Sequence, residues 1–432
     1  MGNPVPRRIA TTIMNALKGG VVPRVGLEYI AVGRKLEIEA LLHDTEVISE
    51  GGAAFRFVVG RFGSGKSFLL QTIRNNAMER GFVLADCDLA PDRRLTGTGG
   101  QGINTYRELM KNLSVRARPD GGALPLVLEK WISGIQSQVA QQGGDPEGED
   151  VEKAVYRACE GLSGMVNGFD FAQVIIRYLQ GYLTGDETQK TNALRWFRGE
   201  YASRLEAKRD LGVHFIVTDD NWYDFMKLMA EFFAAAGYQG LILLIDEMIN
   251  LYKLPNVITR QYNYERVLTM YNDALQGKAR HIGVIMSGTP QSVEDPKRGL
   301  FSYEALRSRL VGGKYSVPGM KDLLAPIIRL EPLTAEEMYV LLERLRDIHA
   351  GLYGYDTQVT GDEMLHFLSV EYGRLGADAS LTPREVIRDF VELLDVAYQS
   401  HKPIPEIMKS AEFEFSVGEL EDGDDGFADF TV

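Results

Sequence analysis

The chain has 432 residues, of which 45% are hydrophobic and 25% are charged, and its formal net charge is −13. These values are typical of a soluble globular protein with two or three domains, and the acidity argues against broad coating of nucleic acid. No apolar run approaches the ~20 residues of a membrane span, and no apolar segment after the N-terminus resembles a secretory signal. Two cysteines exclude a disulfide framework and make a zinc site unlikely, so we expect a cytoplasmic protein.

The segment 60–67 reads Gly-Arg-Phe-Gly-Ser-Gly-Lys-Ser and fits the phosphate-binding P-loop pattern at every specified position. An apolar run at 55–59 predicts a buried strand before it, and the run from Phe68 predicts a helix after it. The helix N-terminus and the loop N–H groups favour phosphate binding. We expect Lys66 to reach the β- and γ-phosphates of ATP and the Ser67 hydroxyl to hold Mg²⁺. The expected phosphate-binding residues are Gly60, Gly63, Ser64, Gly65, Lys66, Ser67 and Phe68.

The next predicted strand covers 81–88, and a glycine-rich loop follows at 97–102. The loop has a GxGxxG-like appearance, but it does not open directly from a strand, so we favour a flexible or partner-contacting loop. Residues 103–240 have mostly helical patterns. This stretch is long for a single crossover between strands, and it predicts an inserted helical subdomain.

Residues 241–245 form a continuous apolar run that is typical of a buried parallel strand, and Asp246-Glu247 follows it directly. Acids at the carboxyl end of such a strand lie at the ligand-binding edge of the sheet. We expect Asp246 to bind Mg²⁺ through water and Glu247 to polarise the water that attacks the γ-phosphate. A solvated acid at a strand end is the simpler alternative, which the upstream P-loop makes less attractive.

Three further groups of polar residues follow the next predicted strand, 281–287. Ser287 and Thr289 are candidates to contact the γ-phosphate or the attacking water, or else to cap a helix. Arg307 and Arg309 stand where an arginine finger is expected, with a solvated surface pair as the alternative. Arg384, in a late helix that Thr382 caps, either reaches the nucleotide or is a plain surface arginine.

The order of these segments resembles the successive motifs of AAA+ ATPases of the origin-recognition and initiator-loader type. The resemblance implies that Val32, Gly33 and Arg34 line the adenine pocket. It also implies that the arginine finger acts on a neighbouring subunit's nucleotide and that Arg384 is the sensor of a helical lid. The helical stretch before Asp246 is longer than in typical AAA+ modules, and no clear winged-helix domain follows the lid.

More narrowly, the chain resembles the ATP-binding protein of BREX-type phage-exclusion systems over roughly residues 7–400. The segments that carry the resemblance are 30–34, 57–71, 97–102, 106–110 and 381–385. This implies a Mg²⁺-dependent, ATP-hydrolysing, homo-oligomeric component of a DNA-directed defence complex. Contact with DNA, either directly or through partner proteins, stays open. The alternative is an ATP-occupied signalling or scaffold protein with little turnover.

The expected fold is α/β: a P-loop NTPase parallel sheet of AAA+ type with a long helical insertion and a C-terminal helical lid. The expected segments are N-terminal helices at 1–54, a core at 55–102 and 241–330, an insertion at 103–240, a lid at 331–405 and an acidic tail at 406–432.

The end of the chain, residues 412–432, carries eight Asp or Glu and no Lys or Arg. Without these eight charges the net charge of −13 becomes −5, which leaves room for a narrow basic channel elsewhere. Such a charge density predicts a disordered tail. Four phenylalanines are spaced among the acids, so the tail either binds a partner, covers a basic channel of this protein, or is only solvated.

Overall fold

Five strands form one parallel sheet in the order β2-β3-β4-β1-β5. They are β1 (Ala53–Val59), β2 (Val83–Asp88), β3 (Leu241–Asp246), β4 (Ile282–Gly288) and β5 (Ile327–Arg329). β1, β3 and β4 are almost continuously apolar and buried, as expected for parallel strands covered on both faces. The expected α/β fold with a parallel sheet and extensive helical regions is therefore confirmed.

The computed structural model describes residues 5–159, 162, 168–311, 322–357, 359–374 and 382–410. Contacts within the chain define two compact units. We call residues 34–331 the α/β unit, and residues 1–33 with 332–432 the helical unit. Of the expected acidic tail at 406–432, residues 406–410 belong to the helix α20 (Ile404–Ser410), and residues 411–432 lie outside the described residues.

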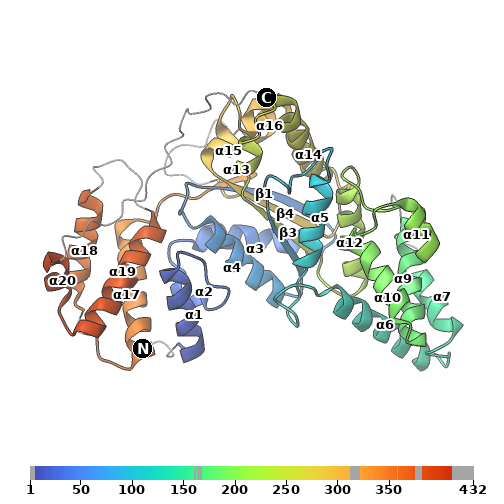
Figure 1. Cartoon of the computed structure of the whole chain (residues 1–432), viewed down its shortest axis with the longest axis horizontal. Coiled ribbons are helices and arrows are strands. Elements are labelled where there is room, and N and C mark those ends of the chain that lie inside the picture. Colours follow the sequence, from blue (N-terminus) through green and yellow to red (C-terminus); the bar gives the residue numbers. More distant parts are fainter. Residues whose placement is uncertain are drawn as a thin grey trace. The chain divides into compact units, whose positions relative to one another are not determined.

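Alternate residues of each strand in the α/β unit enter two separate hydrophobic cores, because successive side chains of a strand point to opposite faces. Val58, Leu84 and Ile242 pack with helices α3 (Lys35–Ser49) and α4 (Lys66–Glu79). Phe57 and Leu243 belong to the core on the other face. Figure 1 shows α3 and α4 on one side of the strands, with α5 (Gln101–Lys111), α12 (Trp222–Ala235) and α14 (Val257–Leu275) on the other.

The long crossover from β2 to β3 is helical wherever the structure describes regular elements, as the sequence predicts. Between α5 and α12 it holds α6 (Leu124–Gln141), α7 (Glu149–Ala158), α9 (Gly168–Thr184), α10 (Glu187–Phe197) and α11 (Arg204–Leu211). Aromatic side chains from separate helices join these elements into one core. Trp196 makes edge contacts with Phe171, Phe197 and Phe225, and its indole N–H donates to the Phe215 carbonyl at 2.8 Å.

Short helices connect the last three strands. β3 leads into α13 (Ile249–Tyr252) and α14. β4 leads into α15 (Pro290–Glu294), the 3₁₀ turn η1 (Leu300–Ser302) and α16 (Glu304–Leu310) before β5. The carboxyl ends of β1, β3 and β4 therefore each open into a loop that starts a helix.

The helical unit contains α1 (Arg7–Lys18), α2 (Leu27–Ile30), α17 (Ala335–Tyr353), α18 (Gly361–Arg374), α19 (Pro383–Ser400) and α20 (Ile404–Ser410). Thr334 and Thr382 begin α17 and α19 with capping boxes to Glu337 and Glu385, which confirms the helix cap expected at Thr382. α1 packs against α17 and α19, and Lys18 forms an ion pair with Asp395 at 2.6 Å.

Both cysteines are buried free thiols. Burial raises the pKa of Cys87 and of Cys159 to about 12, so neither thiol reacts readily. Over the described part of the chain, no helix combines the length and the apolar character needed to cross a membrane.

Candidate functional site

The loop between β1 and α4 wraps tightly because its glycines allow it. A side chain at Gly60 would collide with the Ser64 hydroxyl and would meet the Leu330 Cβ at 3.1 Å. Gly65 has a φ of 92°, in the left-handed region that favours glycine, and it is the N-cap of α4. A glycine at this position has no side chain with which to cap the helix. The N–H groups at a helix N-terminus are a favourable place for an anion.

Polar groups of the loop are held from two sides. The Lys66 ammonium donates to the carbonyls of Gly60 and Arg61, both at 2.9 Å, so the lysine lies along the loop. The Ser64 hydroxyl is buried and has no hydrogen-bond partner in the described structure. The buried guanidinium of Arg34 donates to the Ser64 carbonyl at 3.1 Å and to the Glu331 carbonyl at 2.7 Å. Arg34 thus supports the loop through its backbone.

The Asp246 carboxylate connects the loop with the end of the sheet. One of its oxygens accepts from the Ser67 hydroxyl at 3.1 Å, and the other accepts from the Ser287 hydroxyl and from the Glu247 N–H at 2.7 Å. The strand order explains this convergence, since β4 lies between β1 and β3 and places Ser287 between the P-loop and Asp246. Ser67 and Asp246, which we predicted as metal ligands, are therefore neighbours.

Glu247 lies directly after β3 with an exposed side chain and a φ of 61°. This left-handed backbone is uncommon outside glycine and costs on the order of 1 kcal/mol or more. The following residues hold it in place. The Met248 N–H donates to the Ser287 carbonyl at 3.1 Å, and the Asn250 N–H donates to the Glu247 carbonyl at 3.0 Å. The glutamate is therefore presented at the sheet edge by a rigid turn.

Asp88 is a residue of this edge that the sequence reasoning missed. It ends β2 and stands opposite Asp246 in the β2–β3 register. Desolvation at the edge, together with the neighbouring Asp246 and Glu247 carboxylates, raises its pKa, although the side chain remains accessible. The available signal was its position: Asp88 closes a predicted strand, as Asp246 does.

The two polar candidates after β4 have different surroundings. Ser287 is fully buried and its hydroxyl donates to Asp246, so it orients that carboxylate. The Thr289 hydroxyl accepts from the Ser292 N–H at 3.3 Å and caps α15. The structure thus gives Thr289 the capping contact that we had kept as the alternative.

The arginine candidates lie away from these contacts. Arg307 and Arg309 are exposed on α16, where Arg309 donates to the Ala305 carbonyl at 2.6 Å and Arg307 lies 4.0 Å from Glu304. The remaining candidates, Val32, Gly33 and Arg384, belong to the helical unit. Their roles toward a nucleotide stay predictions.

The second glycine-rich loop, 97–102, contains a carboxylate of the protein. Asp219 accepts from the Gly100 N–H at 2.9 Å and from the Ile103 N–H at 2.7 Å, at the N-terminus of α5. Asn263 accepts from the N–H groups of Leu95 and Thr96 just before the loop. The loop is therefore held at both ends, and Asp219 occupies the position that a phosphate would take.

Two comparisons with known proteins complete this description. No curated protein matches the chain. The family model described as "BREX system ATP-binding protein BrxC/D" matches residues 5–411, nearly the whole chain. The P-loop, the Asp246 contacts and this match agree, and the chain belongs to the BrxC/D family of ATP-binding proteins of the BREX phage-defence system.

Proposed function

We propose that this protein hydrolyses ATP in a Mg²⁺-dependent reaction, as an AAA+-like component of a DNA-directed anti-phage complex. The observation that supports this most is the link from Ser67 through Asp246 to Ser287, beside the open N-terminus of α4. It joins a phosphate-binding loop to a carboxylate edge, and both are needed for hydrolysis rather than for binding alone.

The residues present suit ATP and Mg²⁺. The loop N–H groups and Lys66 supply donors and positive charge for phosphate oxygens. Ser67 and Asp246 supply the hard oxygen ligands that Mg²⁺ prefers, and Mg²⁺ usually takes only one or two protein ligands beside substrate phosphates. In keeping with that, the described residues contain no cluster of three or more His, Cys, Asp or Glu that could form an all-protein metal cage. When bound, Mg²⁺ would neutralise charge that develops on the phosphates.

In this proposal Glu247 orients and polarises the attacking water. The turn at Glu247 presents an exposed carboxylate one residue beyond Asp246, the proposed metal ligand. A water beside Asp246 would therefore be close to the Glu247 carboxylate. Ser287 acts as a positioning residue because it fixes the Asp246 carboxylate. Asp88 adds a third carboxylate to the edge that holds Asp246 and Glu247.

Arg307 and Arg309 supply the arginine finger to a neighbouring subunit, which requires a homo-oligomer. Both are exposed and on the same unit as the P-loop, so they are available to a second copy. A finger contributes about 10³–10⁵ in rate in well-studied NTPases. Mixing Arg307→Ala/Arg309→Ala subunits with Lys66→Ala subunits is predicted to restore part of the hydrolysis. Mixed assemblies that form and show no recovery would assign the pair to the surface.

The experiment that decides the function is steady-state ATP hydrolysis by the full chain, with Mg²⁺ and with a chelator, combined with its mass in solution with and without ATP and DNA. We expect turnover only with Mg²⁺, and a larger assembly with ATP. ATP binding without turnover would replace this proposal by the alternative, a nucleotide-occupied scaffold or signalling protein.

A further inference from the structure

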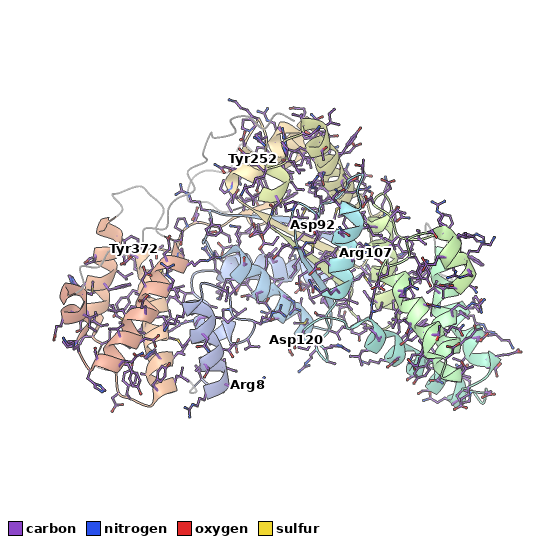
Figure 2. All side chains as sticks on the ribbon, in the orientation of Figure 1. Arg8, Asp92, Arg107, Asp120, Tyr252 and Tyr372 are labelled. Carbon is purple, nitrogen blue, oxygen red and sulfur yellow. The ribbon has the colours of Figure 1, made fainter. Side chains whose placement is uncertain are left out.

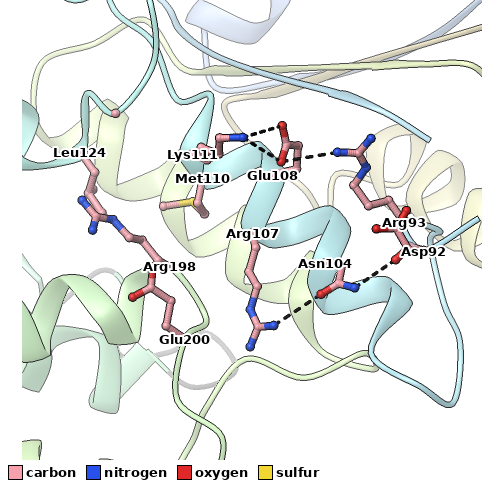
Figure 3. A pocket seen from close by; sticks show the side chains of 11 residues that line it. Asp92, Arg93, Asn104, Arg107, Glu108, Met110, Lys111, Leu124, Arg198 and Glu200 are labelled. Carbon is pink, nitrogen blue, oxygen red and sulfur yellow. Dashed lines mark hydrogen bonds and ion pairs between the residues drawn. The ribbon is translucent and has the colours of Figure 1, made fainter. Parts of the chain in front are cut away.

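A cleft lies over the exposed face of α5, outside the edge strand β2. It has a volume of about 510 Å³, within the range of small-molecule sites. Asn104, Arg107, Glu108 and Lys111, which are three or four residues apart on one helix face, form its floor. Figure 3 shows this face, and Figure 2 places Asp92 and Arg107 beside α5. No P-loop residue and no residue of β3 or β4 lines the cleft, so it is separate from the nucleotide site.

Four cationic side chains line the cleft, and two of them have donors that no protein group satisfies. The Arg198 guanidinium makes no hydrogen bond or ion pair with the other cleft residues that Figure 3 draws. The Arg93 Nε–H is buried and unpaired, although the same guanidinium lies 3.6 Å from Glu108. A buried donor such as the Arg93 Nε–H costs free energy when it remains unsatisfied, whereas the half-buried Arg198 guanidinium is open to water, and an anionic oxygen would satisfy both.

The other two cations have protein partners, of which those of Arg107 are the firmer. Arg107 donates to the Gly199 carbonyl at 2.9 Å and to the Asn104 side chain at 3.4 Å. Lys111 lies 3.3 Å from Glu108. Arg107 thereby ties α5 to the segment that carries Arg198. The cleft is thus partly preorganised, with an anchored Arg107 beside the half-buried Arg198.

Acidic groups restrict the class of ligand. The carboxylates of Asp92 and Glu200 line the same cleft, and neither has a side-chain partner among the described residues. A long polyanion such as a nucleic-acid strand would be repelled by these carboxylates at the rim. A small ligand can instead direct a phosphate at the arginines and hydroxyl or amino groups at the carboxylates.

We propose that this cleft binds a small phosphorylated molecule that also carries hydroxyl or amino donors, of the size of a nucleoside monophosphate or a sugar phosphate. Arg198 and Arg107 contact its phosphate, and Asp92 and Glu200 accept from its neutral polar groups. The site lies at the junction of the sheet and the helical insertion, so the ligand would bridge the two.

Calorimetry on the full chain tests the proposal, with Lys66→Ala in the background to remove tight binding at the P-loop. The probes are AMP, ribose 5-phosphate and inorganic phosphate. We expect AMP or ribose 5-phosphate to bind with a stoichiometry near one, and more tightly than inorganic phosphate. Arg198→Ala should weaken this binding by at least ~10-fold, the loss expected for one charge-assisted contact. Because the Arg198 side chain is half-buried rather than part of the core, the variant is expected to fold normally.

Arg157→Ala is the matched control, since Arg157 is exposed on α7 of the same insertion and does not line the cleft. It should leave probe binding unchanged. The proposal is overturned if none of the three probes binds, or if Arg198→Ala and Arg157→Ala bind a probe equally well. It is also overturned if a single-stranded oligonucleotide binds with Arg198 dependence while all three small probes fail.

Discussion

Two glycine-rich loops of the α/β unit lead into helices with nearly the same backbone shape. They differ in whether a distant carboxylate of the protein bonds to the N-terminus of the helix. Gly65 before α4 has a φ of 92°, and Gly100 before α5 has a φ of 86°. At α4, the side chains of Lys66 and Ser67 bond to carbonyls of the loop and to Asp246 rather than to the first N–H groups of the helix. At α5, the Asp219 carboxylate accepts from two N–H groups, those of Gly100 and Ile103. Asp219 lies 119 residues after Gly100 in the chain.

The comparison shows that glycine spacing creates a backbone shape and does not by itself create an anion site. A helix N-terminus attracts an anion wherever its N–H groups are unsatisfied. Where the protein supplies the anion, as Asp219 does, the same shape is structural. The first loop also has Lys66 and the Asp246 edge beside it, whereas the second has neither.

The largest expected effect tests whether ATP is hydrolysed beside the P-loop, the glycine-rich loop before α4. Glu247→Gln should keep ATP binding and lower hydrolysis by about 10²–10⁴-fold, because an amide does not accept a proton from water as a carboxylate does. Steady-state hydrolysis and ATP calorimetry on the same preparations measure both properties. Glu265→Gln, an exposed glutamate of α14, is the matched control. Unchanged turnover in Glu247→Gln would remove Glu247 from the mechanism.

The next effect concerns phosphate binding at the P-loop. Lys66→Ala removes a charge-assisted contact, which is expected to weaken ATP binding by ~10–100-fold. Lys278→Ala, at an exposed site, should bind ATP like the wild type. Calorimetry with Mg-ATP compares the two variants. Wild-type affinity in Lys66→Ala would show that the phosphates bind elsewhere.

A third variant removes the carboxylate that caps the helix after the second glycine-rich loop. Asp219→Ala removes the carboxylate from the N-terminus of α5 and should lower stability by about 0.5–2 kcal/mol, as for loss of an N-cap. Hydrogen exchange should rise locally at Gly100 and Ile103, with no change in ATP affinity. Asp220→Ala is the control, because Asp220 is the exposed neighbour of Asp219 and its carboxylate is not the one that bonds to α5. Unchanged exchange at α5 would contradict the capping role of Asp219.

The smallest effect separates backbone strain from function. Gly65→Ala and Gly100→Ala each place a Cβ at positive φ, at a cost of about 1 kcal/mol. Thermal unfolding should show a similar loss for both, while only Gly65→Ala should also alter ATP binding. Gly351→Ala, inside α17 with open space around it, should instead raise stability. Equal ATP affinities for the two loop variants would break the comparison.

Local patterns predicted much of this architecture. The P-loop, the buried strands, the Asp246-Glu247 pair and the caps at Thr334 and Thr382 all depend on neighbouring residues, so the sequence indicated them directly. The predicted proximity of Ser67 and Asp246 followed from a general property of parallel sheets. Each of these features depends on residues that are close together in the sequence or on a general property of parallel sheets.

Other features depend on contacts between distant residues, and no local pattern contains them. Asp219 caps a helix from 119 residues away, and Arg34 reaches the Glu331 carbonyl from 297 residues away. Asp88 becomes part of the edge only through the β2–β3 register. The cleft over α5 combines four separate segments in the same way. The predicted roles of Val32, Gly33 and Arg384 remain predictions.

The strand order also has a consequence for how the protein is made. Among the strands that the structure describes, β1 pairs only with β4 and β5, so none of these ladder partners exists until the ribosome has passed residue 282. Until then an apolar segment, including Phe55, Phe57 and Val58, has no neighbouring strand. Unpaired apolar strands promote aggregation of nascent chains. We therefore expect the P-loop to take its final shape late in synthesis, and truncations before β4 to be insoluble.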